Sequence, residues 1–121
     1  MESEKILALA ANALNDKKAV DIKAIKIGDL TVLSEYFLIA SGTSSTHVHA
    51  LADEVEDKLK EADVIPHHIE GRSTGWYVLD YGTVIVHIFS RDQREFYGLE
   101  KMWADGEEID CAKFLNKPEG E

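Results

Sequence analysis

The chain has 121 residues, of which 45% are hydrophobic, so it can bury one sizeable core and points to a single domain. Its 23 acidic and 13 basic side chains give a net charge of −10, which argues against a surface that follows nucleic-acid phosphates and fits a basic protein partner. The single cysteine, Cys111, excludes an internal disulfide and a cysteine-based metal site, and the sequence favours a reduced, cytoplasmic protein with no membrane span.

Apolar periodicity predicts alternating helices and strands along most of the chain. In chain order we expect a helix at 3–17, strands at 19–27 and 35–43, a loop at 41–46 followed by a helix that reaches residue 62, a strand at 64–71, a β-hairpin at 75–89 and a helix at 91–103. The last residues are rich in acids, Gly and Pro. We therefore predict a domain over residues 1–104 and an acidic, disordered tail over residues 105–121.

The order of these elements predicts a mixed β-sheet. The strands at 35–43 and 64–70 flank a helix, so we expect them to be parallel and joined by a right-handed crossover. The first of them has a continuous apolar centre, which is typical of a strand buried on both faces. With the hairpin added, the prediction is an α/β (α+β) domain with a single mixed β-sheet of about five strands flanked by helices.

The hairpin GWYVLDYGTVIVHIF, residues 75–89, has two different faces. If Tyr81 and Gly82 form a two-residue turn, Trp76 lies opposite His87, and alternate residues share a face. One face then carries only aliphatic side chains and a tyrosine, as expected of a core. The other face carries Trp76, Val78, Asp80, Ile85, His87 and Phe89. This second set is typical of a partly exposed recognition surface, and periodicity alone leaves open whether helices cover it instead.

Two other features are candidate chemical sites, the loop at 41–47 and the paired histidines. The loop SGTSSTH, residues 41–47, could hold a phosphate at a helix N-terminus, or it could simply cap the helix. Nucleotidyl transfer would also need two metal-binding acids on a strand, whereas Glu54 and Glu56 lie two apart on a predicted helix. The paired histidines, at 47 and 49 and at 67 and 68, are spaced so that they point apart, so no metal site is predicted.

Several spaced motifs resemble the ribosomal silencing factor family, RsfS, also called Iojap. They are EYFLIASGT, SGTSSTHVHALADEVEDKLKEA, GWYVLDYGTVIVHIF and REFYGLEKMW, within a likeness that covers residues 3–103. The chain departs from the family at Thr46, where a basic residue is expected, and at Thr83, where Asp is frequent. The resemblance implies a nucleotidyltransferase-like fold that lacks the catalytic acids, and hence a binding protein without enzymatic activity, cofactor or metal.

The resemblance also implies a mechanism and a partner. Members of the family bind the large ribosomal subunit through its basic protein uL-fourteen and sterically block subunit joining, which represses translation; free members are often homodimers. Little direct RNA binding and no membrane contact are expected. For this chain we expect the partner-binding residues Trp76, Val78, Asp80, His87, Phe89 and Tyr97, with Trp76 as anchor and Asp80 as charge partner.

Two alternatives stay open at this point. One is a nucleotidyltransferase-like or phosphohydrolase enzyme that uses the 41–46 loop. The other is a scaffold in which the face that carries Trp76 forms a homodimer.

Overall fold

The fold is an alternation of three helices and six strands in the part of the chain that the computed structural model describes, residues 2–28, 34–71, 76–98, 101 and 106–109. The elements, in chain order, are α1 (Ser3–Asp16), β1 (Val20–Lys26), β2 (Tyr36–Gly42), α2 (Ser45–Glu61), β3 (His68–Glu70), β4 (Tyr77–Asp80), β5 (Val84–Ser90), α3 (Arg91–Tyr97) and β6 (Glu107–Ile109).

The six strands form one mixed sheet in the order β3-β4-β5-β2-β1-β6. The central strands β2 and β5 are parallel, in a register that runs from Tyr36 opposite Val84 to Gly42 opposite Ser90. All other neighbours are antiparallel. This confirms the predicted single mixed sheet flanked by helices, with one strand more than the expected five.

The additional strand, β6, lies within the segment predicted to be a disordered tail. Glu107 to Ile109 pair with the end of β1, and Lys23 Nζ lies 3.4 Å from Glu108 Oε1. Composition suggested a solvated segment, but these acids lie beside the lysines of β1, so the prediction of disorder does not hold for them. Residues 110–121 lie outside the described residues, and for them the acidic tail stays a prediction.

The predicted crossover from β2 through α2 leads to β3, which has the expected direction but does not lie next to β2. β3 runs parallel to β2, but β5 and β4 lie between the two strands. All seven residues of β2 are buried, so this strand needs a long apolar neighbour on each side. β5 supplies seven residues, whereas β3 has only three and two of them are exposed, which suits the edge of the sheet.

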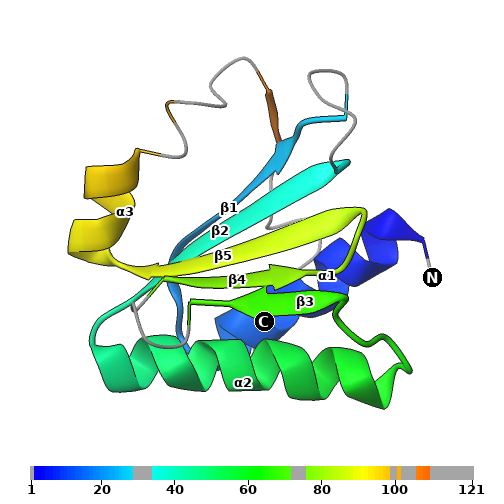
Figure 1. Ribbon diagram of the computed structural model, residues 1–121, viewed down its shortest axis with the longest axis horizontal. Coiled ribbons are helices and arrows are strands. Elements are labelled where there is room, and N and C mark those ends of the chain that lie inside the picture. The colour runs from blue at the N-terminus through cyan, green and yellow to red at the C-terminus, as the bar shows by residue number, and fades with distance from the viewer. Residues whose placement is uncertain (1, 29–33, 72–75, 99–100, 102–105, 110–121) are drawn as a thin grey trace, which may run out of the picture.

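Helices α1 and α2 cover one face of the sheet, and the main core lies between them and the strands (Figure 1). This core takes Leu38 and Ala40 from β2 and Val86 and Ile88 from β5, all fully buried. The start of α2 comes very close to the end of β2. A Cβ atom at Gly42 would lie 2.8 Å from Cγ2 of Val48 and 2.9 Å from its backbone nitrogen, so this position has no room for a side chain.

The opposite face carries a second, smaller cluster, and α3 begins where β5 ends (Figure 1). The cluster contains Ile25, Ile27, Phe37, Ile39 and Phe89, with Trp76 and Ile85 packed against it. The predicted helix at 91–103 begins where expected but is shorter at its C-terminal end: α3 ends at Tyr97, because Gly98 adopts the left-handed conformation (φ 58°) of a helix C-cap.

Candidate partner-binding surface

The hairpin formed by β4 and β5 has a longer loop than the sequence suggested. Asp80 pairs with Ile85 and Val78 with His87, so the predicted pairing of Asp80 with Thr83 and of Trp76 with His87 is wrong by two residues. The loop is closed from within: the Gly82 N–H donates to Asp80 Oδ1 at 2.8 Å, and the Tyr81 N–H donates to the Val84 carbonyl at 2.9 Å. The carboxylate thus stabilises a turn wider than the two-residue turn assumed from sequence.

The two faces of the hairpin are nevertheless those predicted. A register error of two residues keeps every side chain on its side of the sheet, because side chains alternate with a period of two. The buried face belongs to the main core and consists of Tyr77, Leu79, Val84, Val86 and Ile88. Trp76 and His87 lie together on the other face, although His87 pairs with Val78 across the strands.

Trp76 is held in place by an aromatic cluster. Its ring is stacked on Phe89, with centroids 4.8 Å apart, and its Nε1–H donates to His87 Nδ1 at 3.3 Å. Phe37 contacts the same imidazole edge-on, at a centroid distance of 4.7 Å. Trp76 itself is half-buried. Phe89 and His87 therefore fix the orientation of the indole ring, while part of the ring remains exposed.

His87 supports the tryptophan and does not form part of an exposed surface. Its side chain is 6% exposed. Because Nδ1 accepts the bond from Trp76, the proton of the neutral ring is on Nε2, which is buried and has no hydrogen-bond partner among the described residues. Burial lowers the pKa of His87 to about 4, since a charged imidazolium would lose its hydration there. At neutral pH this histidine is an uncharged hydrogen-bond acceptor.

The six residues predicted from sequence to bind a partner fall into three groups. Trp76, Val78 and Asp80 are half-buried and lie on one face. His87 and Phe89 are buried beneath them, Phe89 completely, so they support the surface from below. The side chain of Tyr97, the last residue of α3, lies outside the described part of the structure.

The pairing of β3 with β4 adds residues that the sequence analysis did not place. Glu70 lies opposite Val78, and His68 lies opposite Asp80, so these side chains share a face with the predicted set. Ile85, half-buried and opposite Asp80, also belongs there. We call Glu70, Trp76, Val78, Asp80 and Ile85 the β4 surface. The alternation of the hairpin indicated Ile85, whereas Glu70 could be found only from the pairing of the edge strand.

The loop at 41–46 is occupied by interactions of its own helix. Ser44 is the N-cap of α2, and its Oγ accepts from the His47 N–H at 3.0 Å. The imidazole of His47 accepts from the Thr43 N–H at 2.9 Å through Nδ1, and its Nε2 bonds the Lys17 carbonyl at 2.7 Å. These contacts join the end of α1 to the start of α2. They favour the capping interpretation of the loop over the phosphate-binding one.

Other features of the described residues bear on the class of protein. No group of three or more His, Cys, Asp or Glu side chains within them is arranged to hold a metal ion. His49 instead contacts the Tyr77 hydroxyl at 2.7 Å and Asp53 at 3.2 Å. None of the described helices is both long and apolar enough to cross a bilayer.

Comparison with known proteins decides the family. The model of the family described as "Ribosomal silencing factor during starvation" matches residues 1–121. The chain belongs to the ribosomal silencing factor family. It is 38% identical over 118 residues to the ribosomal silencing factor RsfS of Bacillus subtilis, which covers 97% of this chain and 100% of that protein.

Two further relatives extend the comparison. The mouse protein named "Mitochondrial assembly of ribosomal large subunit protein 1" is 31% identical over 99 residues, which cover 78% of this chain and 43% of the mouse protein. A crystal structure of a Chromobacterium violaceum protein superposes with a TM-score of 0.83 at 35% identity, covering 98% of this chain and 91% of the other. The fold and the family membership therefore agree.

Proposed function

We propose that this chain is a translation repressor that binds the large ribosomal subunit through protein uL-fourteen and sterically blocks subunit joining. The observation that carries the proposal is the β4 surface, which offers a fixed, half-buried tryptophan beside carboxylates in a member of the ribosomal silencing factor family. The name of the mouse relative, which refers to the ribosomal large subunit, supports the same class of partner.

The composition of the β4 surface suits a basic protein partner. Half-buried aromatic residues are frequent anchors of protein interfaces, and Trp76 has that position. Asp80 accepts the hydrogen bond of its own turn through Oδ1, so the other edge of this carboxylate can meet a partner. Glu70 contributes a second, exposed carboxylate. In a chain with a net charge of −10, these groups favour encounter with a positively charged partner.

The mechanism needs no catalysis. Joining of the ribosomal subunits requires a large contact to form, and a domain bound at one point of that contact prevents its closure by its volume alone. The proposal places the protein in the cytoplasm, where subunits join, with little direct RNA contact and no enzymatic step. A homodimer that forms through the β4 surface would compete with docking, so we propose that the ribosome binds the monomer.

Cosedimentation with purified large subunits tests the proposal. Trp76→Ala removes the anchor, and we expect it to remain folded and to lose about 2 kcal/mol of binding free energy, a weakening of roughly thirtyfold. Ile65→Ala is the matched control, because Ile65 is 61% exposed, lies on the loop before β3 and is not part of the β4 surface. Circular dichroism of both variants separates a loss of binding from a loss of fold.

The outcomes are distinct. Comigration of the unmodified protein with large subunits, together with inhibition of subunit joining, supports the proposal. It fails if the protein does not comigrate, or if Trp76→Ala and Ile65→Ala bind equally well. A folded Trp76→Ala variant that keeps ribosome binding but changes from dimer to monomer in sedimentation velocity would instead assign the β4 surface to self-association.

A further inference from the structure

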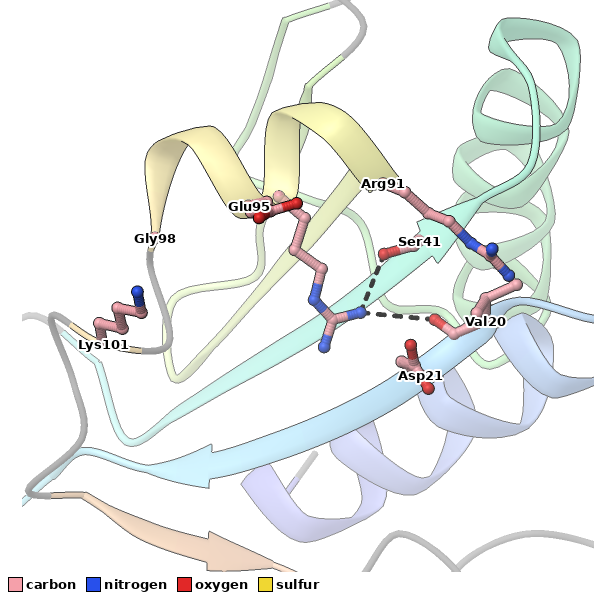
Figure 2. A pocket seen from close by; sticks show the side chains of 8 residues that line it. Val20, Asp21, Ser41, Arg91, Glu95, Gly98 and Lys101 are labelled. Carbon is pink, nitrogen blue, oxygen red and sulfur yellow. Dashed lines mark hydrogen bonds between the residues drawn. The ribbon is translucent and has the colours of Figure 1, made fainter.

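A pocket of about 590 Å³ lies where α3 faces the beginning of β1 and the end of β2 (Figure 2). It is separate from the β4 surface and has no part in the proposed ribosome binding. Its charged lining residues are Asp21, Arg91, Arg94, Glu95 and Lys101. The pocket opens at the carboxyl ends of the parallel strands β2 and β5, the edge at which α/β sheets commonly bind small ligands.

One of the three cations is fixed in the wall of the pocket. Arg94 Nη1 donates to Ser41 Oγ at 2.9 Å and to the Val20 carbonyl at 3.5 Å. Ser41 is 1% exposed, so the guanidinium is tied to a buried point of the sheet. These hydrogen bonds fix the position of the Arg94 positive charge in the wall of the pocket.

The other two cations have no carboxylate partner in the described structure. Arg91 and Lys101 are exposed at the pocket, and the side chains form no ion pair with any described residue. Figure 2 shows them at opposite ends of the pocket. Arg91 also lies three positions before Arg94 on α3, a spacing at which two like charges repel. The repulsion between these two arginines, and the lack of an ion-pair partner for Arg91 and Lys101 among the described residues, indicate that an external anion binds here.

The acidic side of the pocket is built by an irregularity of β1. The register with β2 shifts between Val20 and Lys23, and Asp21 adopts a left-handed backbone conformation with φ 50°. Such bulges redirect side chains and are frequent next to binding sites. Here the bulge brings the Asp21 carboxylate to the pocket and turns the Val20 carbonyl toward Arg94. Asp21 can accept hydrogen bonds from the hydroxyl groups of a sugar, which inorganic phosphate lacks.

We propose that this pocket binds a small phosphorylated molecule with free hydroxyl groups, a sugar phosphate or a mononucleotide. Its phosphate interacts with the fixed Arg94 and with Arg91 or Lys101 at one end of the pocket, and its hydroxyls donate to Asp21. The volume lies in the range of small-ligand sites. Binding of a nucleic-acid polymer is disfavoured, because a surface that follows its phosphates needs a row of basic side chains. Here the cations line a single hollow of an acidic protein.

Nuclear magnetic resonance titrations of the isotope-labelled full chain test the inference without the ribosome, so its result is independent of the proposed function. The probes are adenosine 5′-monophosphate, ribose 5-phosphate, inorganic phosphate, adenosine and citrate. We expect saturable shifts of the amides of Asp21, Ser41, Arg91 and Gly98 with the two phosphorylated sugars and none with adenosine. At least one of Arg91→Ala and Lys101→Gln should weaken binding about tenfold, as expected for one charge-assisted contact.

Two more variants sharpen the test. Lys60→Gln removes an exposed lysine of α2 outside the pocket and should leave binding unchanged. Asp21→Asn should weaken binding of ribose 5-phosphate more than binding of inorganic phosphate, because only ribose 5-phosphate carries sugar hydroxyls that can donate to Asp21 while its phosphate contacts the cations. The inference is overturned if no probe saturates, if Arg91→Ala and Lys101→Gln bind as the unmodified chain does, or if citrate binds as tightly as the phosphorylated sugars. Tighter binding of a short RNA, with shifts that spread beyond the pocket, would also overturn it.

Discussion

Replacing His87 by glutamine should change how the stability of the protein depends on pH. The histidine is buried with its pKa lowered to about 4, whereas an unfolded chain protonates it near its ordinary value of 6.5. Between these values the unfolded state binds more protons than the folded state, so the free energy of unfolding falls as the pH falls. The loss begins as the pH drops below the unfolded pKa and is complete near the folded one.

The size of the effect follows from the two pKa values. A difference of one pKa unit corresponds to about 1.4 kcal/mol, so the cost of His87 reaches about 3 kcal/mol at pH 4 and about 2 kcal/mol at pH 5. His87→Gln carries no titrating group, and its amide oxygen can still accept the Trp76 Nε1–H. Between about pH 7 and pH 5, the free energy of unfolding of the variant should therefore fall by about 2 kcal/mol less than that of the unmodified chain.

Urea denaturation followed by circular dichroism at both pH values measures this difference. Comparing the two proteins cancels the contribution of the many carboxylates, which titrate in both. His67→Gln is the matched control, since it removes an exposed histidine and leaves the aromatic cluster intact. It should keep the steeper pH dependence. Equal losses of stability in the unmodified chain and in His87→Gln would refute the argument that burial keeps this imidazole neutral.

Two further predictions concern the junction between β2 and α2. Gly42→Ala should lower the free energy of unfolding by about 1–3 kcal/mol, because the new Cβ meets the backbone and side chain of Val48; Gly28→Ala, whose Cβ would have ordinary contacts of 3.6 Å or more, should stay within about 0.5 kcal/mol of the unmodified chain in the same urea titration. Ser44→Ala should cost about 1 kcal/mol through loss of the N-cap hydrogen bond, whereas Ser45→Ala, one residue into the helix, should cost less. Equal effects within either pair would contradict these assignments.

The sequence predicted the parts of the fold that depend on periodicity. The complete burial of β2 followed from its apolar centre, and the two faces of the hairpin followed from alternation even though the register was off by two residues. A register error of one residue would have exchanged the faces and removed Trp76 from the candidate surface.

The sequence could not predict features that depend on which strands meet. β6 is a three-residue strand with no periodic pattern long enough to read. β3 lies within the strand predicted at 64–71, but its place in the sheet is set by its neighbours. Glu70 reached the β4 surface only through the pairing of β3 with β4. The pocket is a stronger example, because Asp21, Ser41 and Arg91 come from three elements and meet only after a bulge in β1.

The roles of Trp76 and His87 depend on each other. A half-buried indole needs an acceptor for its N–H, and a carboxylate in that position would place a charge inside the second apolar cluster. A neutral imidazole supplies the acceptor and an aromatic surface for Phe37. It leaves one buried Nε2–H without a partner among the described residues and lowers stability at acid pH. The indole is thereby oriented before any partner binds. Binding then does not have to restrict its rotamers, which would cost about 0.5–1.5 kcal/mol of binding free energy per side chain. If that is its purpose, His87→Gln should weaken ribosome binding less than Trp76→Ala does, and His87→Leu, which has no acceptor, should weaken it more than His87→Gln.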